Sequence, residues 1–416
     1  MQAPGGAGVL RPPGGRGGPQ ALRKGEKLHQ RLRPGTALKV LKFSKLYVGD
    51  GSVLKDVYVG FEGEEITYVG GERPEGELLG EFPVGTPALV DPHSHIGMDR
   101  AGEPYYEEEA NETMDSLLPY LEAQNSVYMD DKAFEESVEW GVLYSAVTHG
   151  SGNIIGGKVA LLRNWKKNVR DAFIKHVGVK AALGYNPRST TSWRGTRPST
   201  RMGVIALFKK AFDKAAADLE DLRKGKKEWK DLEPTSKALV PVLEGRLPLR
   251  VHVHKEDDIA VLISLAKTYG FKYTIDHACD VHTEEGFKMI KESGASLVYG
   301  PVDSHPYKVE LKHESYKNIK LLIKYMPEVT ALMSDHPVVL QRNLMLQLRY
   351  FMMYGMPFEE AIKLVTGNAA KVVGLNAGEV KVGKLVSLVA WNGEPYVLGS
   401  APELVVAEGE VLEVRR

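Results

Sequence analysis

The stretch Ala88–Asp99 reads ALVDPHSHIGMD and holds two histidines separated by a single serine. An apolar run stands before Asp91, so the stretch predicts a short buried β-strand that ends near the histidines. Side chains at positions i and i+2 of a strand point to the same face. His93 and His95 can therefore converge on one metal ion, although two ordinary core histidines would show the same local pattern.

The middle of the chain repeats short apolar runs separated by longer helix-like stretches. Alternation of strands and helices is typical of a parallel sheet, and about eight strands are typical of a (β/α)8 TIM-like barrel of the α/β class. In such a barrel the active site lies at the carboxyl ends of the strands. The eight runs are LVDPH, YSAVTHG, VALLRNW, VGVKAALG, LRVHVH, YTIDHA, ASLVYG and VTALMSD.

Metal-ligating side chains stand at the ends of four of these predicted strands. Histidine nitrogens together with a carboxylate oxygen suit a divalent metal, zinc in the first place, with iron, manganese or nickel as alternatives. Four strands that carry such residues at the same end favour a metal site over a set of unrelated core histidines. The candidate ligands are His93 and His95 on the first strand, His252 and His254 on the fifth, His277 on the sixth and Asp335 on the eighth.

The two ends of the chain differ from the middle. Residues 1–36 are rich in Gly and Pro and predict a disordered tail. Residues 37–87 and 377–416 contain short β-rich runs broken by turn residues, which is typical of hairpins. We therefore expect one small β-sandwich domain built from both chain ends, around a barrel formed by residues 88–376.

Composition excludes several classes of partner. The 54 Lys and Arg residues balance 54 Asp and Glu residues, so no charge favours nucleic acid or an anionic membrane. One cysteine, Cys279, allows no internal disulfide, which suits a reducing cytoplasm. No apolar run reaches the roughly 20 residues of a membrane span. A small-molecule substrate remains as the expected partner, and a homo-oligomer stays open.

Several motifs together resemble the amidohydrolase superfamily, and within it the imidazolonepropionase-related group. The resemblance extends from about Val40 to the C-terminus. The motifs are the His93 and His95 pair, NIIGGKVALL, RPSTRMGV, ALMSDHPVV and MPFEEAIKLVTGNAAKVVGL.

This resemblance implies a metal-dependent hydrolase that cleaves a C–N bond other than a peptide bond in a small molecule, such as an amide or a cyclic amide. The metal would activate a water, and Asp335 would act as general base and return the proton to the leaving nitrogen. On the fifth strand either His252 or His254 could be the metal ligand, with the other contacting substrate. A deaminase with the same machinery and a catalytically impaired scaffold protein are the alternatives.

The fourth strand departs from the family pattern. It ends in ALGYNP, with Tyr185 where relatives carry a glutamate that could ligate a metal. Lys180 on the same strand could become carboxylated and bridge two metals, or it could be an ordinary lysine. Together these departures favour a single metal ion or an altered site, although two ions stay open.

Further residues are candidates for substrate binding. Arg201, together with Ser199, could hold a substrate carboxylate. His149 follows the second strand and could contact substrate. The acidic stretch YYEEEANE, residues 105–112, borders the expected active-site mouth and could favour a basic substrate group. The segment GNIIGGKV nearly fits a phosphate-binding loop, but Val159 replaces the required Ser or Thr, so its glycines are expected in a loop after the second strand.

Overall fold

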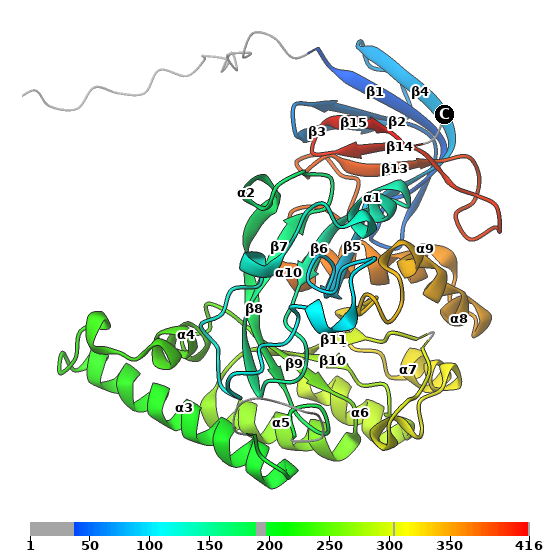
Figure 1. The fold of residues 1–416 in the computed structure, drawn as a ribbon. Coiled ribbons are helices and arrows are strands. Elements are labelled where there is room, and N and C mark those ends of the chain that lie inside the picture. Colours follow the sequence, from blue (N-terminus) through cyan, green and yellow to red (C-terminus); the bar gives the residue numbers. More distant parts are fainter. Residues whose placement is uncertain (1–36, 189–196, 303, 415–416) are drawn as a thin grey trace, which may run out of the picture. The chain divides into compact units, whose positions relative to one another are not determined.

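The computed structural model describes residues 37–188, 197–302 and 304–414 (Figure 1). The disordered tail predicted for residues 1–36 lies outside these described residues. The described residues form two sheets and the helices around them.

One sheet contains eight strands in sequential order, as the eight apolar runs predict. Beyond its last strand, the backbone N–H of Asp335 donates to the carbonyl of His93 (3.1 Å). The N–H of His95 likewise donates to the carbonyl of His336 (3.0 Å), so the sheet is nearly closed into a barrel. The strands are β5 (Leu89–Ser94), β6 (Val142–Val147), β7 (Ile155–Arg163), β8 (Phe173–Ala182), β9 (Leu249–Val253), β10 (Tyr273–His277), β11 (Ser296–Tyr299) and β12 (Thr330–Leu332).

Strand β7 departs from the parallel pattern expected of a (β/α)8 barrel, because it runs antiparallel to both β6 and β8. Only residues 148–154 join β6 to β7, whereas a parallel crossover needs a dozen residues or more. The glycines of GNIIGGKV were expected in a loop, and this expectation is wrong for Gly156 and Gly157, which lie inside β7. A Cβ on Gly157 would lie 2.6 Å from the imidazole of His149, so a glycine is needed there.

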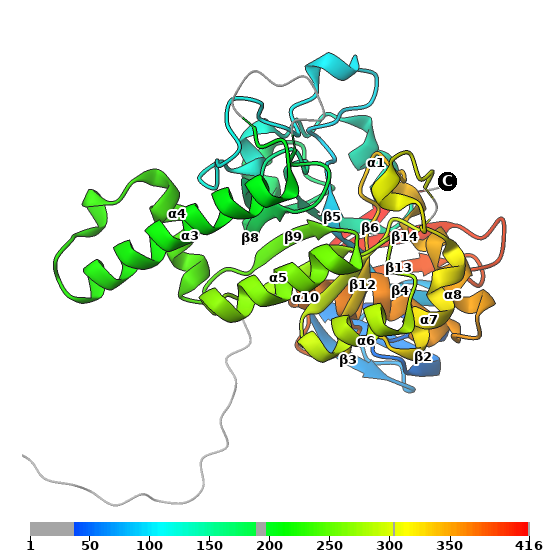
Figure 2. The same cartoon turned by 90° about the horizontal axis from the view of Figure 1, so that it is seen from below.

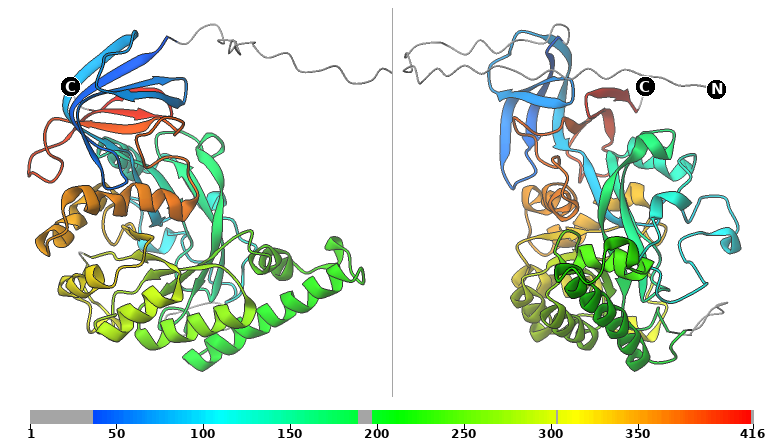
Figure 3. Two further views of the ribbon diagram at one scale, coloured as in Figure 1. Left: turned by 180° about the vertical axis from the view of Figure 1, so that it is seen from behind. Right: turned by 90° about the vertical axis from the view of Figure 1, so that its left-hand side faces the viewer.

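Helices follow most of the other barrel strands. Helix α5 shows the local reasons: three acidic residues occupy its first turn, and Gly270 ends it with φ of 74°. Figure 2 shows α3 beside α4, and Figure 3 shows α5 and α6 packed together. The helices are α1 (Lys132–Glu139), α2 (Val169–Ala172), α3 (Arg201–Arg223), α4 (Pro234–Leu243), α5 (Glu256–Tyr269), α6 (Glu284–Ser293), α7 (Ile319–Lys324), α8 (Leu348–Met353), α9 (Phe358–Ala361) and α10 (Gly367–Val373).

The second sheet contains seven strands from both chain ends, in the order β15-β14-β13-β4-β1-β2-β3. Strand β4 pairs with β13, so strands from the two ends meet in one sheet. All seven strands share one hydrogen-bonded sheet, and a β-sandwich of two separate sheets is therefore not confirmed. The strands are β1 (Lys39–Tyr47), β2 (Val53–Glu62), β3 (Glu65–Gly70), β4 (Glu77–Pro87), β13 (Ser387–Trp391), β14 (Pro402–Ala407) and β15 (Glu410–Glu413).

Polar contacts that are buried or partly buried join the barrel to the C-terminal strands. The hydroxyl of Tyr144 on β6 lies 2.6 Å from the Ser387 hydroxyl on β13. Arg163 on β7 donates to the carboxylate of Glu408 (2.8 Å). Among the described residues, no helix has the length and apolar character needed to cross a bilayer.

Candidate metal centre

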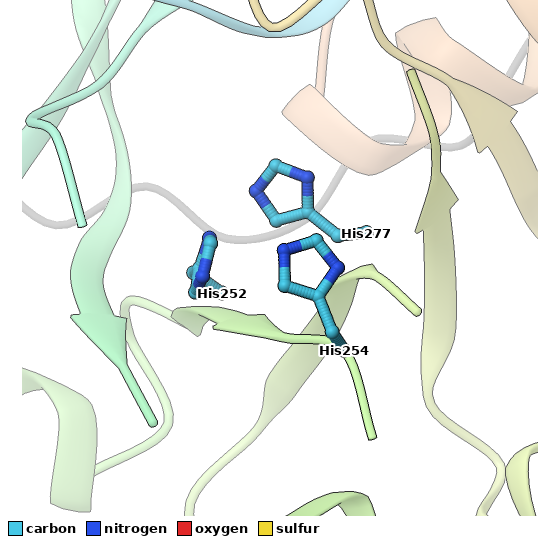
Figure 4. A group of neighbouring side chains, drawn as sticks. All are labelled: His252, His254 and His277. Carbon is cyan, nitrogen blue, oxygen red and sulfur yellow. The ribbon is translucent and has the colours of Figure 1, made fainter. Parts of the chain in front are cut away.

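Three histidines from two neighbouring strands converge at one end of the barrel. His252 lies in β9, His254 follows that strand, and His277 ends β10. Their ring centroids lie 4.4 to 4.8 Å apart, and Figure 4 shows the three rings gathered beside the end of β9. One nitrogen from each ring could bind the same ion. His252 and His254 were alternatives in the sequence, and the fold brings both to the cluster because they are two residues apart.

A second group of potential ligands shares His277 with the first. It adds His93 from β5 and Asp335, which follows β12. Asp335 Oδ1 lies 3.3 Å from His93 Nε2 and 3.0 Å from Nε2 of His95, which follows β5 directly. All six residues named as ligands from the sequence therefore lie in one connected cluster. Two overlapping ligand groups suit either one ion or two.

Hydrogen bonds orient three of these imidazoles. The Nδ1–H of His95 donates to the carbonyl of Thr148 (2.7 Å), and that of His277 donates to the carbonyl of Gly300 (2.8 Å). His93 Nδ1 lies 2.8 Å from the carboxylate of Asp276. A carbonyl or an ionised carboxylate can only accept, so each ring carries a proton on Nδ1 and turns Nε2 toward the cluster. This arrangement is typical of metal-ligating histidines.

Asp276 and Arg250 lie around the candidate ligands, and the sequence analysis did not predict a role for either residue. Arg250 is buried and donates to Thr274 Oγ1 (2.9 Å) and to the Pro92 carbonyl (2.6 Å). Burial would raise the pKa of Asp276, but the Arg250 charge and the bond from His93 hold it well below its usual value. Asp276 is therefore ionised beside His93. The available signal was its position directly before His277, in the segment IDHA.

Several buried imidazole nitrogens in the cluster lack partners. No hydrogen-bond partner reaches either nitrogen of His252, Nδ1 of His254 or Nε2 of His277 within the described part of the chain. Burial lowers the pKa of His277 to about 3 and that of His252 well below its usual value, so both rings are neutral at pH 7. Each unsatisfied buried group costs about 1–3 kcal/mol. Neutral imidazoles with bare nitrogens are what a divalent metal binds.

The backbone at the cluster adopts conformations that L-residues rarely take. His277, Ala278 and Asp335 have φ angles of 80°, 55° and 49°. Such positions cost about 1–3 kcal/mol each and persist where the surroundings impose them. Asp91 supplies part of that restraint, because its carboxylate accepts from the backbone N–H of Ser334 (3.2 Å) and from the Ser334 hydroxyl.

Lys180, rather than Tyr185, is the β8 residue at the cluster. Lys180 is fully buried, and its Nζ lies 3.4 Å from His93 Nε2. Burial lowers its pKa to about 8. Tyr185 is partly exposed and lies near the Lys308 ammonium, which is 5.7 Å from its ring centre. Tyr185 is thus a side chain that contacts a cation, and nothing places it among the candidate ligands.

The two residues proposed to contact substrate lie in different places. Arg201 begins α3, is half exposed and pairs with Asp258 at 2.6 Å, so an ion pair already occupies its guanidinium. Its role as a carboxylate-binding residue stays a prediction. His149 is buried, and it follows Thr148, whose carbonyl orients His95.

A third group of possible ligands lies outside this cluster, at Asp280, His282 and His313. Lys255 Nζ already lies 2.7 Å from the carboxylate of Asp280, and His313 Nδ1 lies 3.3 Å from it. The carboxylate therefore has a cationic partner of its own. We assign no metal to this group.

Comparison with known proteins finds similarity to one broad family, whose matched region contains several of the candidate ligands. Residues 246–412 match the model of the amidohydrolase family. This match includes His252, His254, His277 and Asp335. The narrower imidazolonepropionase-related group is not confirmed.

Two amidohydrolases and a dipeptidase are similar to this chain. The amidohydrolase tasK of Hapsidospora irregularis is 24% identical over 367 residues, which cover 78% of this chain and 36% of the relative. The chain thus spans about a third of that relative's length. An amidohydrolase structure from Thermotoga maritima MSB8 aligns with a TM-score of 0.83 at 28% identity, over 91% of this chain and all of that one. A Xaa-Pro dipeptidase shares the fold, with a TM-score of 0.52 at 14% identity over 90% of this chain and all of that one.

Proposed function

We propose that this protein is a metal-dependent hydrolase of a C–N bond in a small molecule, with the cluster of His93, His95, His252, His254, His277 and Asp335 as its metal centre. The observation that carries the proposal is the set of neutral, buried imidazoles with unpartnered nitrogens. The similarity to amidohydrolases supports the same reaction class. The dipeptidase among the structural neighbours keeps peptide bonds within the range of substrates.

The residues present fit a divalent ion. When bound, such an ion supplies Lewis-acid chemistry, lowering the pKa of a water toward neutrality and polarising a carbonyl. His93, His95 and His277 would hold it through Nε2, because their Nδ1 atoms are engaged elsewhere. Zinc, iron, manganese and nickel all suit imidazole and carboxylate ligands.

Asp335 is the proposed proton carrier. Burial would raise the pKa of its carboxyl, but the neighbouring His277, His93 and His95 hold it well below its usual value, so the group is ionised at pH 7. The backbone N–H of Asp335 is anchored to the His93 carbonyl, which keeps the carboxylate at the cluster. It would accept the proton of the attacking water and donate it to the leaving nitrogen.

The first test is metal content by elemental analysis, on the wild type and on the double variant His93→Ala/His95→Ala. We expect at least one equivalent of divalent metal in the wild type and its loss in the variant, because two of the ligands disappear. The matched control is His176→Ala, since His176 lies on β8 and bonds Gln124 instead (3.1 Å). Release of amine from N-acyl amino acids and dipeptides should follow metal content in all three proteins.

The outcomes separate the alternatives. Two equivalents of metal require a bridging group, a role that carboxylated Lys180 would fill. Ammonia release without amide cleavage indicates a deaminase. If the wild type takes up no metal even after reconstitution, the proposed hydrolase function is contradicted. A catalytically impaired scaffold protein then becomes the favoured alternative.

A further inference from the structure

We infer that the protein selects substrates that carry a cationic group, and that an acidic cavity beside the metal centre holds this group. The inference rests on the proposed function, because it names the substrate class of the same site. The cavity lies along the segment between β5 and α1, on the side of the acidic stretch of residues 105–112.

The cavity measures about 410 Å³, and four glutamates line it: Glu108, Glu109, Glu112 and Glu122. No lysine or arginine of the described residues lines it. Two of the four carboxylates have cationic partners outside the lining. Arg100 lies 2.7 Å from Glu109, and Lys158 lies 3.2 Å from Glu122.

Glu108 and Glu112 differ from the other two, because their hydrogen-bond partners are uncharged. Glu108 accepts from the backbone N–H of Ala110 (2.6 Å), and Glu112 accepts from the N–H of Met114 (3.0 Å). Among the residues that the structure describes, no cation lies within ion-pairing distance of either one. The cavity therefore retains two uncompensated negative charges.

The acidic wall is held in place against the segment that follows β6. The N–H of Gly150 donates to the Ala110 carbonyl (2.7 Å), and the N–H of Gly152 donates to Asn111 Oδ1 (3.1 Å). Asn153 also donates to the Glu112 carbonyl (2.9 Å). A wall fixed by these bonds can present its carboxylates in a defined position.

His149 links this cavity to the metal centre and points independently to a ligand. It lines the cavity, it is only 5% exposed, and its Nδ1 has no hydrogen-bond partner in the described chain. Burial, followed by the charge of Lys180, lowers the pKa of His149 to about 3, so the neutral ring does not repel a cation. Its neighbour Thr148 bonds the ring of His95 (2.7 Å). A substrate could thus place its scissile bond at the metal and its cationic end among the glutamates.

The test compares choline with 3,3-dimethylbutan-1-ol, its uncharged carbon isostere, as ligands of the full-length protein with its metal. Neither compound contains a hydrolysable bond, so binding is read by calorimetry without turnover. We expect choline to bind about tenfold more tightly at low salt, and about 0.5 M NaCl to remove most of that preference. The double variant Glu108→Gln/Glu112→Gln should lose the preference.

The matched control is Glu107→Gln, which removes the same charge from an exposed position outside the cavity lining. It should bind choline as the wild type does. Equal binding of the two compounds by the wild type, or no choline binding up to about 10 mM, overturns the inference. Equal loss in the control and in the double variant also overturns it. If the double variant does not fold, the wild type alone provides the test. A choline preference that salt does not reduce then overturns the inference.

This experiment separates the two proposals, because it needs no catalysis. A choline preference in a protein that hydrolyses no amide leaves the cavity assigned and contradicts the proposed function. Amide hydrolysis without any preference for choline supports the proposed function and contradicts the inference about the cavity.

Discussion

At the scale of single residues, the candidate site depends on side chains that orient the candidate metal ligands through hydrogen bonds. Asp276 and Arg250 do not face the predicted ion, yet they position His93 from β5, which lies far away in the sequence. Asp276 is fully buried and ionised, so it can hold the proton of His93 on Nδ1. Nε2 of the same ring faces Asp335 and Lys180 and is the atom expected to bind metal.

The substitution Asp276→Asn tests this positioning role. Asparagine can still accept from His93 Nδ1, but it lacks the charge that makes the imidazole more basic. We expect metal affinity, measured by competition with a chelator, to fall by about 10- to 100-fold. Asp258→Asn is the control, because Asp258 is a buried carboxylate that pairs with Arg201 away from the cluster. An equal fall in both variants would show that Asp276 has no specific role at the metal.

At the scale of elements, hydrogen bonds to one buried carboxylate hold helix α3 against helix α4. Asp218 on α3 is buried and accepts from Lys214 and from the Ser236 hydroxyl of α4, each at 2.6 Å. Lys227, in the connection between the helices, donates to its other oxygen (2.7 Å). Burial would raise the pKa of Asp218, but these three partners hold it well below its usual value. Helix α3 therefore contains one buried carboxylate with hydrogen-bond partners on both oxygens.

This carboxylate gives stability a defined pH dependence. Because the folded-state pKa is depressed, its contribution is present above the unfolded value of about 3.9 and is lost as pH falls toward the folded value. We expect Asp218→Asn to lower the free energy of unfolding by about 2 kcal/mol at pH 7. The difference from the wild type should shrink below pH 4, as measured by urea unfolding. Asp221→Asn, at a more exposed ion pair with Lys227, should cost less than about 1 kcal/mol.

At the scale of the whole described molecule, the seven-stranded sheet has a core of its own and also contributes side chains to the core of the barrel. Tyr47, Val389 and Trp391 of the smaller sheet belong to the same buried cluster as the barrel strands. The indole N–H of Trp391 donates to Thr86 Oγ1 (3.0 Å). Shared burial of this kind predicts that the two sheets unfold together.

Tyr144→Phe tests this coupling. Tyr144 is fully buried, and its hydroxyl bonds Ser387 (2.6 Å) and Glu408 (3.1 Å), both from the C-terminal end of the chain. Its removal leaves polar partners unsatisfied, so we expect a loss of about 1–3 kcal/mol in one cooperative transition. Tyr316→Phe, at a partly exposed ring, should change stability by less than about 0.5 kcal/mol. Two separate transitions in the Tyr144→Phe protein would mean that the sheets fold independently.

Local patterns were sufficient for much of the fold. The eight apolar runs predicted the eight barrel strands, because a buried strand is recognisable from a few consecutive residues. The β-rich runs at the two chain ends predicted a β-sandwich domain, which is not confirmed, although strands from both ends do pair in one sheet. The reversal of β7 was missed, although the short connection from β6 would have indicated it.

The candidate ligands were also predictable, because each stands at the end of an apolar run and strand ends meet at one edge of a barrel. Their partners were not predictable in the same way. His93 and Asp276 are 183 residues apart, and only folding brings their side chains within 2.8 Å. The same holds for Lys180 beside His93 and for the acidic loop beside His149. Strand and helix periodicity is a property of neighbouring residues, whereas these contacts follow from how distant strands close into a barrel, which the tertiary structure alone decides.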